Sequence, residues 1–197
     1  MSFSRRRLLF AAASLPLLAS CASSGQPRKF TLSPISGPAG GPAWSLSIAA
    51  PRALKSLDSE RIAHRPDALE LQYYTGADWV DRAPQMLQML MIRSFQNRSN
   101  LQVTALDMPG PPGDFLLTSL LQDFQSEGNR AHITLVASLA RGNRRQDSRT
   151  QVFEASAAAG SDHMDAMVAA FDDAFADIMK KMIPWSLAAG EEMRRNS

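Results

Sequence analysis

The chain contains a single cysteine, Cys21, and its neighbours have the most distinctive pattern in the sequence. Upstream lie three consecutive arginines at positions 5–7 and an apolar run at 8–18, followed by the small residues Ala19 and Ser20. A positive segment, a short apolar run and small residues before a cleavage point are typical of a bacterial secretory signal. The run is too short to cross a bilayer, which needs roughly 20 residues. Residues 1–20 are therefore predicted to be a signal peptide.

Leu18-Ala19-Ser20-Cys21 also matches the lipobox of bacterial lipoprotein precursors, with Ser20 where Gly or Ala is commoner. This motif predicts cleavage between Ser20 and Cys21 and a thioether from the Cys21 thiol to diacylglycerol. The alternative is an ordinary signal peptide followed by a free cysteine, an unpaired thiol that would need another explanation in a secreted chain. Three acyl chains exceed the two signals that stable membrane anchoring requires. We expect a palmitate-type lipid anchor.

The signal bears on two further questions, the export route and the membrane in which the protein is anchored. Residues 4–9 resemble the twin-arginine export motif, but arginines are common in any signal, so both export routes stay open. Ala22 follows the cysteine where an Asp would favour retention in the inner membrane. Its presence favours the periplasmic face of the outer membrane.

No other residues form a recognisable catalytic or ligand-binding pattern. His64, His132 and His163 lie in different predicted elements without the spacing of metal ligands. There is no Gly-x-Ser-x-Gly elbow and no phosphate-binding loop. We therefore expect no enzyme activity, no cofactor and no metal. Four arginines within residues 141–149 predict a solvated hairpin tip, with contact to lipid headgroups or an acidic partner as the alternative.

The precursor's formal charge of +2 is misleading, because three of its 21 Lys and Arg residues belong to the predicted signal. The mature chain keeps 18 basic against 19 acidic residues, so the sequence provides no argument for nucleic-acid binding. About 177 mature residues make one domain with one sizeable core. We divide the chain into a signal (1–20), a lipidated tether (21–29), a domain (30–188) and a flexible tail (189–197).

Hydrophobic periodicity predicts the elements that form this domain. Period-two patterns predict strands at 30–32, 44–50, 61–64, 68–74, 101–106, 114–124, 133–139 and 150–157. Helical spacing predicts helices at 84–97 and 162–183, the second ended by Pro184. Turns are predicted at 65–67, 75–78, 126–129 and 141–143, and a proline-rich surface loop at 108–113. This order indicates an α/β fold, with a mixed, largely antiparallel sheet and two main helices packed on it.

Seven methionines lie in the two predicted helices, and thioethers adapt to varied apolar ligands. They therefore offer a lipid groove as one interpretation, although core packing is the default at helical spacing. They are Met86, Met89, Met91, Met164, Met167, Met179 and Met182.

The order of several short motifs resembles the family of ABC-type transport auxiliary lipoproteins. Residues 61–65 and 69–74 are followed by a third motif, Trp79-Val80-Asp81-Arg82-Ala83-Pro84, that opens the first predicted helix. This family includes paraquat-inducible protein C-like lipoproteins and those encoded beside MCE (mammalian cell entry) lipid transporters. The resemblance implies a fold similar to the TolB amino-terminal domain. It also implies a non-enzymatic partner of the MCE-domain subunit of an inner-membrane ABC transporter that moves lipid between membranes.

Trp79, Asp81, Arg82 and Pro84 correspond to the family signature and have two interpretations. They fix the turn into the first helix, with Trp79 in packing, or Arg82 contacts a partner. A TolB-like lipoprotein that regulates envelope or peptidoglycan assembly is the alternative function. The oligomeric state also stays open, with a homo-oligomer among the partners considered.

Overall fold

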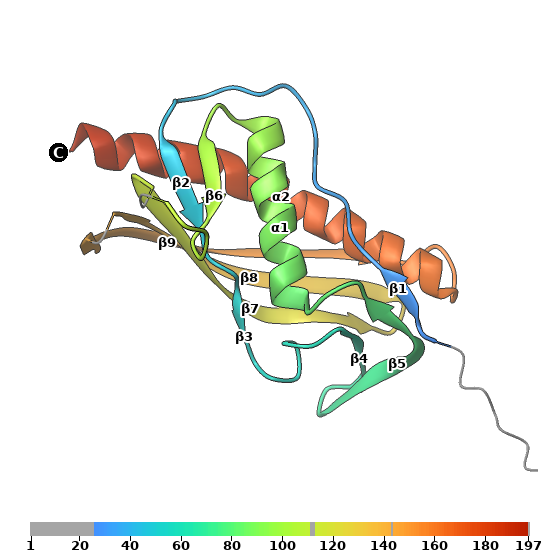
Figure 1. The fold of residues 1–197 in the computed structure, drawn as a ribbon. Coiled ribbons are helices and arrows are strands. Elements are labelled where there is room, and N and C mark those ends of the chain that lie inside the picture. Colours follow the sequence, from blue (N-terminus) through green and yellow to red (C-terminus); the bar gives the residue numbers. More distant parts are fainter. Residues whose placement is uncertain (1–25, 111–112, 143, 197) are drawn as a thin grey trace, which may run out of the picture.

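The computed structural model describes residues 26–110, 113–142 and 144–196, so the signal peptide, Ser20 and Cys21 lie outside the described residues. Figure 1 shows two helices and a mixed sheet in one α/β domain, as predicted. The elements are β1 (Arg28–Phe30), β2 (Ser45–Ile48), β3 (Arg52–Ala53), β4 (Arg61–Asp67), β5 (Glu70–Trp79), α1 (Ala83–Arg98), β6 (Gln102–Ala105), β7 (Phe115–Glu127), β8 (Arg130–Arg141), β9 (Arg144–Ala158) and α2 (Met164–Arg195).

Strand β7 is the centre of the sheet, because other strands pair with both of its edges. On one edge β8 runs antiparallel to it, and β9 runs antiparallel to β8, which confirms the predicted meander. On the other edge β2, β3 and β4 follow one another along β7, all parallel to it. From there the sheet branches, with β6 beside β2 and with β5 and β1 beside β4. The long pairings are antiparallel and the short ones are mostly parallel.

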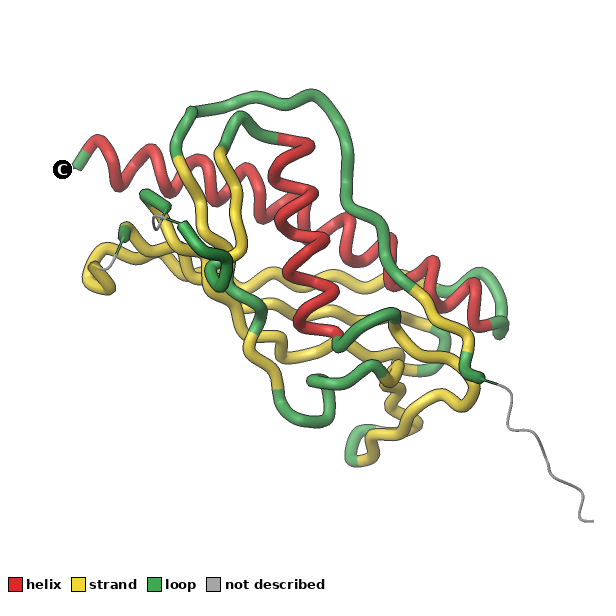
Figure 2. Tube along the Cα trace, viewed as in Figure 1, coloured by secondary structure: helices red, strands yellow, loops and turns green. Residues whose placement is uncertain are grey.

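Both helices pack on one face of the sheet and contact each other (Figure 2). Helix α1 lies between the two branches of the sheet, and α2 lies across β8 and β9 (Figure 1). In β8 the residues at odd positions from Ala131 to Leu139 are fully buried beneath the helices, whereas Thr134 and Val136 are only partly buried. The opposite face of β7, β8 and β9 is therefore the solvent face of a two-layer domain.

The predicted strands and helices mostly recur, with shifted ends. Helix α1 begins at Ala83 and has proline in its first turn, where a missing N–H costs nothing. The β4–β5 hairpin exists, but its turn lies at Ala68 and Leu69 because β4 continues to Asp67. The turn predicted at 75–78 is wrong. These residues belong to β5, whose end pairs with β1.

The largest error concerns Pro184, which was expected to end the last helix. Helix α2 continues through it to Arg195, so residues 189–195 are helical and the predicted flexible tail from residue 189 is wrong. An interior proline costs about 3 kcal/mol through a lost hydrogen bond and a clash. Burial of Ala189 and Met193, together with an edge-to-face contact between Trp185 and Phe153 at 5.4 Å, offsets this cost. Tertiary packing therefore overrides the local signal.

The amino-terminal boundary is also shifted. Arg28 and Lys29, assigned to the tether, already pair with Ala77 and Asp78 of β5. None of the helices in the described part of the chain is long and apolar enough to cross a membrane.

The close packing of α2 against Trp44, the residue before β2, generates a stability prediction. A Cβ atom added at Gly190 would lie 2.6 Å from Cζ2 of Trp44, a ring that is 4% exposed and has little room to move. We expect Gly190→Ala to lower the free energy of unfolding by about 1–3 kcal/mol, measured by denaturant titration. Gly160→Ala is the matched control, because nothing lies within 4 Å of its added Cβ. Equal stability of the two variants would contradict the packing described here.

Candidate functional site

The four signature residues lie together where β5 passes into α1, next to β1. We call this region the tether junction and define it as β1, the segment 57–60, the end of β5 and the first turn of α1. Strand β1 overlaps the end of the predicted tether (21–29) and is the first strand of the described chain. Cys21 and Ser20 lie outside the described residues.

Trp79 is the packing centre of the tether junction. Its side chain is fully buried, and its ring centroid lies 5.1 Å from that of Phe124 in β7 and 5.4 Å from that of Phe171 in α2. Its backbone N–H donates to the carbonyl of Glu60 at 2.6 Å. Trp79 thus joins β5, the central strand and α2.

Asp81, Arg82 and Pro84 shape the entry into α1. The Arg82 backbone N–H donates to Oδ1 of Asp81 at 2.7 Å, and the Arg82 guanidinium pairs with the Asp58 carboxylate. Arg82 occupies the N-cap position without a side-chain cap hydrogen bond, and Pro84 is buried in the first turn. The Arg82 side chain remains 52% exposed, so the ion pair leaves part of it accessible from outside.

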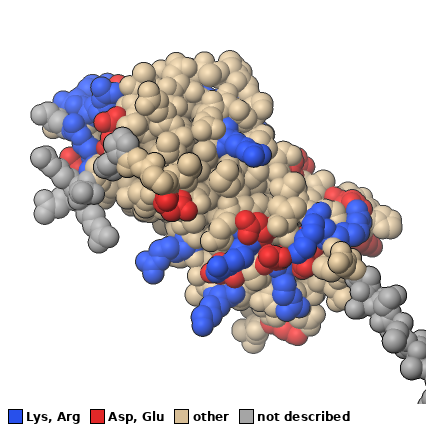
Figure 3. Space-filling model, viewed as in Figure 1, with Lys and Arg blue, Asp and Glu red and all other residues tan. Residues whose placement is uncertain are grey.

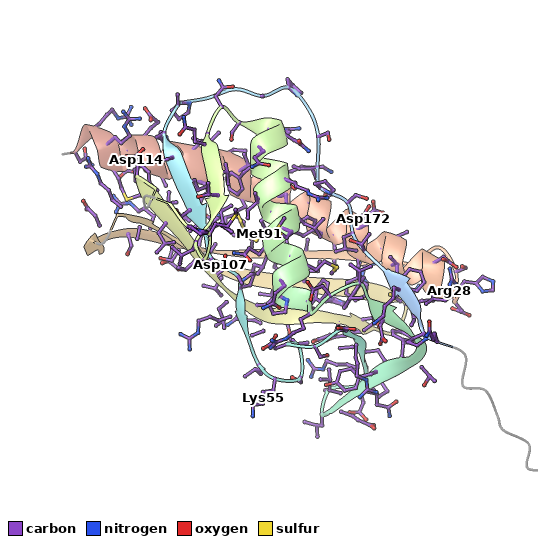
Figure 4. All side chains as sticks on the ribbon, in the orientation of Figure 1. Arg28, Lys55, Met91, Asp107, Asp114 and Asp172 are labelled. Carbon is purple, nitrogen blue, oxygen red and sulfur yellow. The ribbon has the colours of Figure 1, made fainter. Side chains whose placement is uncertain are left out.

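Ion pairs hold β1 against the rest of the domain. Lys29 Nζ lies 2.6 Å from a carboxylate oxygen of Glu60 and 3.4 Å from one of Asp78. Arg28 donates to both carboxylate oxygens of Asp165 at the start of α2, at 3.1 and 2.7 Å. In Figure 4 Arg28 projects from the end of the molecule where β1 meets α2. Charge therefore supplements the few backbone hydrogen bonds of a three-residue strand.

These contacts shift ionisation in the direction that favours the charged forms. The hydrogen bond from Arg28 lowers the pKa of the Asp165 carboxyl, and the hydrogen bond to Glu60 raises the pKa of the Lys29 ammonium. The Lys29 side chain is 42% exposed and the Asp165 side chain 64%, so salt screens the interactions of both groups. Both shifts keep the Asp165 carboxylate and the Lys29 ammonium charged over the neutral range of pH.

Figure 3 shows that charged side chains gather around the tether junction and at the end of the molecule near the carboxyl terminus. Between them the surface over α1, β2 and β6 has few charges, and residues 31–51 contain none. On the face shown in Figure 3, a largely uncharged area over α1, β2 and β6 thus lies between two groups of charged side chains.

Two of the four arginines of the predicted hairpin tip, Arg141 and Arg149, contact the end of α2, and the side chains of the other two lie outside the described residues. Arg149 pairs with Glu192 at 2.8 Å, and Nη1 of Arg141 donates to the carbonyl of Met193 at 3.3 Å. Close by, the N–H and hydroxyl of Ser45 donate to Asp114 and lower the pKa of its carboxyl. Figure 4 places Asp114 far from Arg28, beside the last turns of α2. The contacts of Arg149 and Arg141 fasten the last turns of α2 at the end of the domain opposite β1.

The described residues contain no group of three or more His, Cys, Asp or Glu side chains that could hold a metal ion. His64 packs against the Tyr74 ring at 4.8 Å, and His163 is the N-cap residue of α2. Most of the helix methionines lie in the core, with Met91, Met179 and Met182 fully buried and Met89 48% exposed. Met91 points between α1 and the sheet in Figure 4.

Sequence reasoning selected the four signature residues, whose role stays a prediction, and it missed the ion pairs of β1. Lys29 lies 31 residues from Glu60, and Arg28 lies 137 residues from Asp165. No local pattern pairs charges over such distances. Only the strand order, which brings β1 beside β5 and α2, makes these pairs visible.

The ion pairs predict how firmly β1 is held. The Val80 backbone N–H donates to the carbonyl of Phe30 at 2.8 Å, so its hydrogen exchange reports the docking of β1. We expect the double variant Arg28→Ala, Lys29→Ala to lower the protection factor of Val80 several-fold and to leave that of Leu135 in β8 unchanged. The lowered Asp165 pKa and the raised Lys29 pKa predict constant protection from about pH 5 to pH 9.

Outside this pH range, the docking of β1 weakens in a direction set by the pKa shift of each group. The Asp165 contribution is present above the unfolded-state pKa of about 3.9 and is lost as pH falls through the lowered folded value. The Lys29 contribution is present below about 10.4 and is lost as pH rises through the raised folded value. If the Val80 amide is equally protected in the unmodified protein and in the double variant, backbone pairing alone holds β1.

Comparison with known proteins agrees with this architecture. The family model described as ABC-type transport auxiliary lipoprotein component matches residues 30–183. A protein of the DUF330 family from Xanthomonas campestris is 26% identical, with a TM-score of 0.70 over 87% of this chain and 98% of its own. A second crystal structure, of an uncharacterized protein, shares the fold at 12% identity, with a TM-score of 0.61 over 79% of this chain and 98% of its own.

No curated protein matches the chain. The family model covers most of the sequence, from the last residue of β1 to the middle of α2, and it includes the whole tether junction except its first two residues. The chain therefore belongs to the family of ABC-type transport auxiliary lipoprotein components.

Proposed function

We propose that the protein is the non-enzymatic lipoprotein of an ABC/MCE-type transport system that moves lipid between membranes. In this proposal it docks the periplasmic part of the transporter, through its MCE-domain subunit, to the outer membrane. Family membership supports a role beside an ABC transporter, and the lipobox at Cys21 supports a membrane anchor. The tether junction is the observation that carries the proposal, because it joins the predicted anchor to the folded domain.

The geometry suggests how such an anchor would act. Residues 22–27 separate Cys21 from β1, and six extended residues span at most about 20 Å. The domain would therefore stay within about that distance of the lipid surface. A pull on the tether would reach β1 first and then β5, whose last residue is the buried Trp79. The signature residues would resist that pull by holding β5 and α1 together.

The proposal predicts that the full acylated chain, solubilised in mild detergent, recovers the MCE-domain subunit in a pull-down. The control is an unrelated outer-membrane lipoprotein solubilised in the same way. If the subunit is not recovered under conditions that preserve such complexes, the docking role fails.

Cys21→Ser tests the anchor separately. Because the described fold begins at residue 26, after Cys21 in the chain, we expect the variant to keep the thermal unfolding temperature of the acylated protein. Loss of three acyl chains should release it from the membrane fraction and abolish lipid transport between membranes. Transport by this released form at the normal rate would show that the anchor plays no part in the mechanism.

A further inference from the structure

Strand β9 has one edge that no strand in the described part of the chain covers, because it pairs with β8 alone. The Ala159 N–H donates to the carbonyl of Asn129 at 2.7 Å, which sets the phase of this antiparallel ladder. Hydrogen-bonded and non-hydrogen-bonded pairs alternate along such a ladder. The N–H and C=O groups of Thr150, Val152, Glu154 and Ser156 therefore point away from β8.

Long side chains already cap part of this edge. Lys181 donates to the carbonyl of Glu154 at 3.3 Å, and Arg130 donates to that of Ser156 at 3.4 Å. At the other end Arg149 donates to the carbonyl of Ser148 at 3.3 Å. Between these caps, the outward groups of Thr150 and Val152 have no hydrogen-bond partner among the described residues. We call residues 150–152 the open edge.

Apolar side chains flank the open edge on both faces of the sheet. On the solvent face, Leu120, Val136 and Val152 form one row across β7, β8 and β9, and the row ends at Val152, which is 56% exposed. On the helix face, the half-buried Trp185 of α2 packs edge-to-face against Phe153. Cross-strand apolar pairs stabilise a sheet, so both flanks would gain from one more strand.

We propose that the open edge receives an extended segment of the transporter's MCE-domain subunit as an added strand, which rests on the function proposed above. Backbone hydrogen bonds would supply affinity, and alternate side chains would supply specificity. The segment should be uncharged at its centre, with an apolar residue facing Val152 and its neighbour facing Trp185. Capped carbonyls at both ends of the open edge limit the pairing to a short stretch.

The position of α2 favours a single strand over a second copy of the chain. Paired strands lie about 4.8 Å apart, whereas packed helices need about 8–10 Å between their axes. Helix α2 makes its most extensive sheet contact with β9, so it lies close to this edge (Figure 1). Two copies joined edge to edge would crowd their α2 helices. A bare strand fits beside β9 without this conflict.

Amide hydrogen exchange tests the proposal on the full acylated chain in detergent, with the purified periplasmic portion of the MCE-domain subunit as the probe. The amides of Thr150 and Val152 should exchange at least 10-fold more slowly in the complex. The Leu69 amide, at the tip of the β4–β5 hairpin, is the internal control and should not change.

Variants at the open edge provide the second measurement. Val152→Pro removes an N–H that β8 does not use, and prolines are tolerated on the free side of edge strands. It should weaken binding of the subunit at least 10-fold. Val152→Lys, which keeps the backbone intact, should act in the same direction if the proline variant does not fold. Leu120→Lys is the matched control in the same row, two strands from the edge, and should bind normally.

The outcomes separate this inference from the function on which it rests. Binding without protection of residues 150–152 would overturn the added strand and leave the docking function standing. Absence of any binding would overturn both. Protection that rises with protein concentration when the subunit is absent would assign the open edge to a second copy and overturn the proposal.

Discussion

Burial of the Trp79 ring between Phe124 and Phe171 is the contact on which the rest of the fold depends. One large side chain joins the strand next to the tether, the central strand and the long helix. Aromatic residues of this size dominate the energetics of a core. Because no cysteine remains among residues 22–197 to form a disulfide, this packing has to hold the two sheet branches and the helices in one body.

The charged contacts serve a different purpose from the core. They fasten the ends of the chain, Arg28 and Lys29 at β1 and Arg141 and Arg149 near the end of α2. Exposed ion pairs contribute little to global stability, but they set how easily a terminal segment detaches. If the lipid anchor proposed above pulls on β1, this local resistance to detachment matters more than the total stability.

The two sheet edges formed by β6 and β9 differ in how well their outward backbone groups are hydrogen-bonded. Strand β6 also lies at an edge, yet Gln96 donates to the carbonyl of Val103, and Met108 donates to that of Ala105. In strand β9, side chains of the described residues cap the carbonyls of Ser148, Glu154 and Ser156. Unpaired edges invite association and are usually blunted by charge or cover. The open edge between these caps is long enough for the short added strand proposed above. It is too short for extended pairing with an unrelated strand.

The sequence by itself determined the predicted anchor motif, the α/β class, the meander and helix α1. Each of these follows from local periodicity or from residues adjacent in the chain, as in the alternation of residues 133–139. Only the tertiary structure decided that α2 continues through Pro184, because burial of Met193 and its neighbours offsets the local cost. It also decided that β1 pairs with β5 and that Lys29 meets Glu60. Those contacts join residues far apart in the sequence, and local sequence patterns do not show which distant residues will meet.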